Sequence, residues 1–298
     1  MSMKKAFLQL HAAVFLAGFT GIMGRLITLN AGLLVWYRLL ITVVVMWLLF
    51  HFTGKLIKVA KKDILKLTGI GFLSAMHWLT FYASIKTSNV SVALVCFSAV
   101  GFFTALLEPI LLKKKFNRTE LMLGIIVMIG IYIIFHFDAD YKTGIILGVS
   151  SAVLLAASMI YFKVFVEKLG SETTLTYQLS GALLTLSIVM PFYLFQFPTS
   201  YLFPDINDWI WLLILSLVCS VLAFQLTGHA IKKLSAFTVN LTFNLEPVYG
   251  IILAFIIYKE NQLLSKWFFA GIALVAISLI IHIFLLVKVE RDLTHEEK

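Results

Sequence analysis

The sequence predicts an all-α integral membrane protein whose ten transmembrane helices form two inverted five-helix repeats. Three observations predict this fold: an excess of apolar residues, ten long apolar runs and a similarity between the two halves of the chain. Of 298 residues, 61% are hydrophobic and 13% charged, whereas soluble domains contain about 45–50% and about 25%. So few charged residues cannot cover a soluble protein of this length, and lipid is therefore the expected solvent. A β-barrel is disfavoured because polar and apolar residues do not alternate.

Ten apolar runs are each long enough, at about 20 residues, to cross the hydrocarbon layer as a helix. No comparable stretch is left for a soluble domain. The longest interruption, residues 196–208, is rich in turn formers and is expected to be a loop. The expected spans are residues 6–26, 33–51, 64–85, 89–112, 119–137, 143–164, 173–195, 209–231, 235–258 and 264–287.

Basic residues indicate the orientation of these spans. If the N-terminus lies in the cytoplasm, 18 of the 24 Lys and Arg residues fall in inner segments and four in outer segments. Cytoplasmic loops of membrane proteins carry such an excess. The sequence therefore predicts a multi-pass protein of the cytoplasmic (inner) membrane with both termini cytoplasmic. The net charge of +9 then reflects topology, and no nucleic-acid partner is expected.

The second half of the chain resembles the first. A shift of 147 residues places residues 82–86 over residues 229–233, and a shift of 140 places Tyr37-Arg38-Leu39 over Tyr177-Gln178-Leu179. Because each half has five spans, an odd number, the halves must cross the bilayer in opposite directions. We expect residues 1–140 to form the first repeat and residues 141–298 the second, with a short cytoplasmic tail. Secondary transporters are built on this plan and hold their substrate near the midplane.

Four short motifs, in this order, resemble the EamA-type members of the drug/metabolite transporter superfamily. They are Trp36-Tyr37-Arg38-Leu39, Tyr82-Ala-Ser-Ile-Lys86, Leu245-Glu246-Pro247-Val248 and Tyr258-Lys259-Glu260. The resemblance covers nearly the whole chain. It implies a permease for small metabolites, often an exporter of amino acids or related compounds, with a central cavity between the halves.

The chain also departs from the family pattern. It has Ala17-Gly18 where the family usually has Trp-Gly, Val100 where the family has a proline, and Lys113-Lys114-Lys115 where the family has an acidic residue. These departures bear on the substrate, which the resemblance does not name.

Glu246 lies near the middle of the ninth span, where its short side chain cannot reach the headgroups. Pro247 has no N–H to donate, so the helix is weakened beside this carboxylate. Glu246 would then bind a cation, carry a proton or hold a substrate amine; alternatively it bonds a neighbouring helix at a structural kink. Asn240 and Asn244 share a helix face, whereas Glu246 is about 200° beyond Asn244.

Three other ionisable residues enter the spans. Arg38 either extends to the headgroups or binds a substrate carboxylate. For Arg25 we expect extension to the headgroups, and for Glu108, next to three lysines, an interfacial ion pair.

The third and eighth spans carry the other candidate path residues: His77, Trp78, Tyr82 and Gln225. Aromatic rings with a few polar groups suit a pocket for small organic molecules, although membrane His and Trp residues also serve in helix packing. His77 and Trp78 point about 100° apart, so we expect only one of them to line a path. Small residues that favour close helix packing are Gly18, Gly21, Gly24, Gly144, Gly148 and Ala152.

The function expected from these features is a secondary transporter, a permease or exporter, that moves small metabolites such as amino acids across the cytoplasmic membrane by alternating access. A coupling proton or ion is left open, as is a monomer or a homodimer. No catalytic residues, metal or cofactor are expected, because the spans lack an HExxH motif, an Asp pair or a Ser/His/Asp set and the chain has no ATP-binding loop. The alternatives are an intramembrane enzyme acting on a lipid-like substrate and a non-transporting membrane scaffold or sensor.

Overall fold

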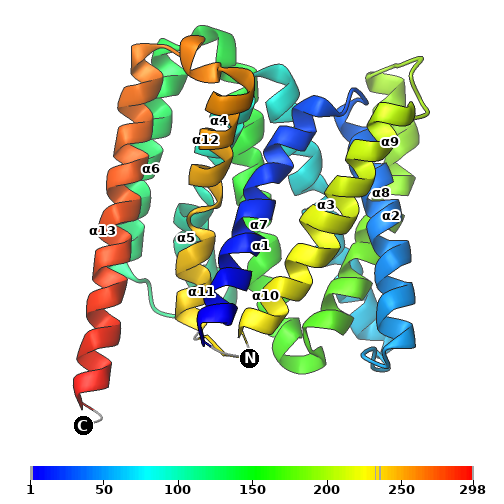
Figure 1. The fold of residues 1–298 in the computed structure, drawn as a ribbon, viewed down its shortest axis with the longest axis horizontal. Helices are drawn as coiled ribbons and strands as arrows, with labels where there is room; N and C mark the ends of the chain where they lie inside the picture. Colours follow the sequence, from blue (N-terminus) through cyan, green and yellow to red (C-terminus); the bar gives the residue numbers. More distant parts are fainter. Residues whose placement is uncertain (1–2, 232, 235, 297–298) are drawn as a thin grey trace.

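The computed structural model describes residues 3–231, 233–234 and 236–296, and these residues are almost entirely helical (Figure 1). The α-helices are α1 (Met3–Leu26), α2 (Ala31–Phe52), α3 (Lys61–Thr87), α4 (Val90–Phe97), α5 (Val100–Leu112), α6 (Arg118–Phe137), α7 (Lys142–Leu169), α8 (Ser171–Gln196), α9 (Ile206–Leu213), α10 (Ala223–Ile231), α11 (Ala236–Phe243), α12 (Glu246–Tyr258) and α13 (Lys266–Glu296). A π-helix, η2 (Ile214–Leu222), joins α9 to α10, and two short 3-10 turns are η1 (Ala139–Tyr141) and η3 (Glu260–Gln262).

Nine helical segments within the described residues are long and apolar enough to cross a membrane. The remaining expected span, the ninth, is divided between α11 and the apolar helix α12. The prediction of an all-α membrane fold is therefore confirmed, and two of the spans, the fourth and the ninth, are interrupted between two helices. Both ends of the chain lie on the same side of the bundle (Figure 1), which we call the termini side; the other is the opposite side.

Several helices begin at an Asn or Asp whose side chain accepts a backbone N–H of the first turn. Asn30 accepts from Leu33 at 2.9 Å before α2, and Asn89 accepts from Val92 at 2.8 Å before α4. Asp205 does the same for α9. These caps replace the hydrogen bonds that a first helical turn lacks, which matters most where water is scarce.

The fourth and ninth spans have the same construction, in opposite directions. Each has a helix of eight residues, a two-residue break and a helix of 13 residues. Each then ends at a lysine in the left-handed conformation, Lys113 (φ 53°) or Lys259 (φ 54°). The helix boundaries of the two spans correspond at a shift of 146 residues. This is one residue less than the shift of 147 at which the sequences of the two halves were matched above. In Figure 1, α4 and α12 occupy one half of the bundle height and α5 and α11 the other.

Pro247 accounts for the position of the second break. It occupies the first turn of α12 and is buried. A proline there leaves no donor unsatisfied, because the N–H groups of a first turn have no partner in the helix. The same proline within a continuous helix would have left the Phe243 carbonyl without its donor. The sequence thus ends one helix and begins the next beside Glu246.

The two repeats interlock through their helices. Helix α3 of the first repeat packs against α7 and α8 of the second, and α1 packs against α10 and α12. Helices α6 and α13, the last of each repeat, lie side by side at the edge of the bundle (Figure 1). They meet at Gly130 and Gly271, where a Cβ built on Gly130 would lie 2.6 Å from the Gly271 carbonyl oxygen.

Replacing Gly130 with alanine should lower the melting temperature of the purified protein, because the added methyl group meets backbone that cannot turn away. Overpacking of this kind costs about 1–3 kcal/mol. The matched control is Gly69→Ala in α3, where a Cβ meets nothing within 4 Å and alanine stabilises a helix by roughly 0.5–1 kcal/mol. Equal shifts for the two variants in thermal unfolding would contradict the close α6–α13 contact.

Candidate functional site

Arg38 is a buried cation in the interior of the bundle, only 5% exposed. Its guanidinium donates to the Tyr82 hydroxyl at 2.8 Å and to the Ser220 hydroxyl at 3.0 and 3.3 Å. These partners come from α3 and η2, so three spans meet around one charge. No carboxylate of the described residues lies within ion-pair distance of Arg38.

Trp78 forms one wall of this cluster. The Arg38 guanidinium carbon lies 4.5 Å from the centroid of the Trp78 ring, a cation–π arrangement that stabilises a desolvated cation. The neighbouring His77 has different partners: its Nδ1 lies 2.7 Å from the Ser151 hydroxyl, and its ring packs against Phe81 and Phe97. His77 therefore contacts α7, whereas Trp78 lies against Arg38.

Glu246 begins α12 at the break in the ninth span. Its carboxylate accepts no hydrogen bond from, and forms no ion pair with, any side chain that the structure describes. It is close enough to Arg38 and Tyr82 to interact with them electrostatically, but it forms no ion pair or hydrogen bond with either. The interior thus contains a guanidinium and a carboxylate that lie within electrostatic range of one another and are not paired.

The π-helix brings two serines to Arg38. Ser220 donates to the Leu215 carbonyl at 3.0 Å, five residues back, while its oxygen accepts from the guanidinium. Ser216, one turn earlier, donates to the backbone carbonyl of Arg38 at 3.3 Å. Isolated π-helical turns inside α-helices occur frequently at functional sites. Sequence reasoning missed both serines, although their spacing of four on one face of an apolar span was a signal.

The other polar residues expected at the site have different positions. Asn244 lies in the break itself, and Gln225 lies on α10; neither is among the contacts of Arg38 in the described residues. Asn240 lies on α11, but its side chain is outside the part of the chain that the structure describes. The expected angle of about 200° between Asn244 and Glu246 does not apply, because it assumes one continuous helix.

The glycine stripe on α1 allows close approach to three other helices. A Cβ on Gly18 would lie 2.8 Å from the Glu246 carbonyl oxygen, one on Gly21 would meet Val90 at 3.1 Å, and one on Gly24 would meet Tyr82 at 2.6 Å. On α7, Gly144 and Gly148 face Ser88 and Cys96 in the same way, and Ala152 is fully buried. Helix α1 therefore lies directly against the broken spans and the Arg38 cluster.

Arg25, whose side chain is 42% exposed, has a partner that the sequence did not predict. Its guanidinium forms an ion pair with Glu260 at 2.8 Å and lies 4.4 Å from the centroid of the Tyr258 ring. The sequence gives no sign of this pairing, because 235 residues separate the two side chains. Glu108, in contrast, forms the expected ion pair, with Lys114 at 2.8 Å.

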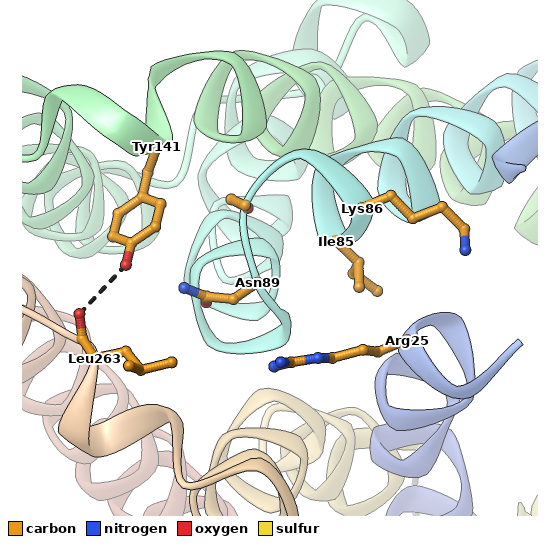
Figure 2. Close-up of a pocket in the computed structure, with 7 residues that line it drawn as sticks. Arg25, Ile85, Lys86, Asn89, Tyr141 and Leu263 are labelled. Carbon is orange, nitrogen blue, oxygen red and sulfur yellow. Dashed lines mark hydrogen bonds between the residues drawn. The ribbon is translucent and has the colours of Figure 1, made fainter. Parts of the chain in front are cut away.

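A cavity of about 350 Å³ lies on the opposite side of the bundle from the chain ends. Its lining residues are Arg25, Ile85, Lys86, Ser88, Asn89, Tyr141 and Leu263. Figure 2 shows Arg25 extending from α1 beneath Ile85 and Asn89, and a hydrogen bond from Tyr141 to the Leu263 carbonyl. Arg38 and Glu246 do not line this cavity.

The fold and the interior cluster define a class of protein: a multi-pass membrane transporter with inverted repeats and broken spans. Among the described residues, no group of three or more His, Cys, Asp or Glu side chains is placed to hold a metal ion. The model of the EamA-like transporter family matches residues 4–136 and 142–282. The chain belongs to the EamA-like transporter family.

Two relatives are named as transporters, and a solved structure shares the fold. "Uncharacterized transporter YetK" of Bacillus subtilis (strain 168) is 27% identical over 272 residues, which cover 86% of this chain and 80% of that protein. An "Uncharacterized transporter" of Haemophilus influenzae is 27% identical over 157 residues, covering 49% of this chain and 51% of that protein. A structure described as "Crystal structure of protein" has the same fold, with a TM-score of 0.63 at 15% identity over 96% of this chain and 99% of that one.

Proposed function

We propose that this protein is a secondary transporter of small zwitterionic metabolites, amino acids above all, across the cytoplasmic membrane. Its two repeats alternate access to a site between Arg38 and Glu246, and the termini side is the cytoplasmic side. The observation that carries the proposal is the buried Arg38 guanidinium, which lies within electrostatic range of the Glu246 carboxylate; neither group forms an ion pair with any residue that the structure describes.

The physical argument begins with the cost of burial. A charged side chain at the centre of a membrane helix costs about 2.5–3.5 kcal/mol on insertion scales. Tyr82, Ser220 and Trp78 offset part of this cost for Arg38. A ligand carboxylate would offset more, because it accepts two parallel hydrogen bonds from a guanidinium.

Glu246 supplies the complementary charge. An ammonium group held by its carboxylate and a carboxylate held by Arg38 together make a ligand of no net charge. The filled site then contains two balanced ion pairs, whereas a simple anion or a simple amine would satisfy only one of the two protein charges. The chemistry of the pair therefore favours α-amino acids and related zwitterions over monovalent ions.

The same polar residues bear on two other functions, proton coupling and intramembrane catalysis. Glu246 could carry a coupling proton rather than a substrate amine, and the two are separable by experiment. An intramembrane enzyme would need acid, base or metal-binding groups that converge on one atom; the Arg38 cluster contains a cation, hydroxyl groups and an indole but no such set.

The binding test compares one amino acid with its two truncated forms on the purified protein. Leucine should raise the melting temperature, whereas 4-methylpentanoic acid, which lacks the amine, and isoamylamine, which lacks the carboxylate, should bind at least about tenfold more weakly, since a charged hydrogen bond contributes about 1.5–3 kcal/mol. A panel of other amino acids identifies the preferred side chain. The absence of binding for every zwitterion would contradict the proposal.

Substitutions assign the two ends of the ligand. In Glu246→Gln, the amino acid should bind no more tightly than its acid analogue, which lacks the amine. In Arg38→Gln, it should bind no more tightly than the amine analogue, which lacks the carboxylate. The matched control is Glu108→Gln, which removes an ion-paired glutamate in α5, away from Arg38. If Glu246→Gln leaves amino-acid binding intact but abolishes a pH dependence of uptake, Glu246 carries a proton instead.

Ser220 should act by positioning Arg38 rather than by touching the ligand. Ser220→Ala is expected to weaken amino-acid binding several-fold, because the guanidinium loses two donor contacts to one hydroxyl, while Ser220→Thr, which keeps the hydroxyl, should restore it. The control is Ser187→Ala, whose hydroxyl instead accepts from the Trp36 indole. Equal affinities for the alanine variants at both positions, measured by titration, would exclude this role.

A further inference from the structure

Glu260 is a fully buried carboxylate on the opposite side of the bundle, with a side-chain exposure of 0%. It accepts hydrogen bonds from Arg25 at 2.8 Å, from the Ser91 hydroxyl at 2.6 Å, and from the backbone N–H groups of Val90 and Ser91 at 3.1 and 2.8 Å. The carboxylate therefore occupies the N-terminus of α4, where helix N–H groups favour a negative charge. One side chain joins α1, α4 and the turn that follows α12.

Neighbouring contacts close the same side of the bundle. The Lys86 ammonium donates to the Ile27 carbonyl at 2.8 Å, and the Tyr258 hydroxyl donates to the Ile22 carbonyl at 3.0 Å. Arg25 and Lys86 also line the cavity of Figure 2, and Arg25 forms its ion pair with the buried Glu260.

The first repeat lacks the corresponding acid. At the shift of 146 residues that superimposes α4–α5 on α11–α12, Glu260 corresponds to Lys114. The Lys114 ammonium donates to Glu108 within its own span at 2.8 Å. A lysine has no acceptor atom and cannot receive the N–H groups of a helix start. The inverted repeats thus share a backbone plan but differ in the side chain at this position.

We propose that Glu260, with Arg25 and the start of α4, is the latch of a gate on the opposite side. The proposal rests on the proposed function, because a gate needs a path. Opening the opposite side separates a buried carboxylate from its cation and its backbone donors. The latch therefore favours the state in which the opposite side is closed.

A difference in latch strength has a defined consequence for transport. The apparent affinity for a ligand is reduced by the fraction of protein in the competent state. A stronger latch therefore raises the ligand concentration that is needed to load the protein from the opposite side. The latch does not set the direction of net flux, which follows the gradients.

The test measures the distance across the latch and needs no substrate. Spin labels are placed on the exposed residues Thr87, three residues before α4, and Gln262, two residues after Glu260. The background carries Cys96→Ala and Cys219→Ala, since both native cysteines are otherwise free. Distances between the labels are measured by pulsed electron paramagnetic resonance in lipid nanodiscs. The unsubstituted latch should give one short distance, with a longer population of about 10% or less.

Glu260→Gln removes the charge and keeps the shape of the side chain. The ratio of long to short distances should rise at least about tenfold, as expected for the loss of a charge-assisted hydrogen bond. Arg25→Gln should act in the same direction but more weakly, because the α4 donors remain. The double variant should resemble Glu260→Gln alone, since both residues act through one contact.

Glu108→Gln serves as the control, because it removes an ion pair of the same length that does not join the two ends of the latch. The proposal is overturned if Glu260→Gln lowers the melting temperature while the distance distribution stays single and short, which is the result for a purely structural cap. It is also overturned if the unsubstituted protein already has a dominant long distance. Amino-acid binding at Arg38 and Glu246 is measured separately, so either proposal can fail while the other holds.

Discussion

The absence of water inside the bilayer is the constraint on which the rest of the structure depends. Hydrocarbon offers no hydrogen bonds, so every backbone group freed where a helix stops must find a partner within the protein. Two spans stop and restart inside the bundle, and each solves the problem locally. At the break in the fourth span, the N–H groups of Ser98 and Ala99 donate to the carbonyls of Leu94 and Cys96 in α4. At the break in the ninth span, Pro247 occupies a first-turn position of α12, where a missing donor leaves no gap.

The same constraint explains why charges accompany the breaks. A carboxylate is tolerated where helix N–H groups point at it, and Glu260 is fully buried on those terms. Glu246 also begins a helix, but its carboxylate lacks a described partner. The two acids therefore differ in their partners. Glu260 is bound within the protein, whereas Glu246 has no side-chain partner among the described residues and lies within electrostatic range of Arg38.

Much of the fold could be predicted from the sequence because apolar runs, basic loops and an odd number of spans per half each have one physical interpretation. Arg38 and Glu246 stand out for the same reason: a charge within an apolar run needs a cause. The pairing of Arg25 with Glu260 could not be predicted, since either residue alone fits the membrane surface. Ser216 and Ser220 were missed because a serine in a membrane helix does not by itself indicate a role. Their contacts with Arg38 depend on the π-helix. The break at Ser98 has no proline to mark it, and the side on which His77 packs depends on Ser151, which is 74 residues away.

The measurement that tests the central claim most directly is an experimental structure of the protein with its preferred amino acid bound. The zwitterion should lie between α2 and α12, with its carboxylate within hydrogen-bond distance of the Arg38 guanidinium and its amine within hydrogen-bond distance of the Glu246 carboxylate. A ligand bound instead in the cavity lined by Arg25 and Lys86, or an Arg38 guanidinium that has closed onto Glu246 with no ligand between them, would contradict it.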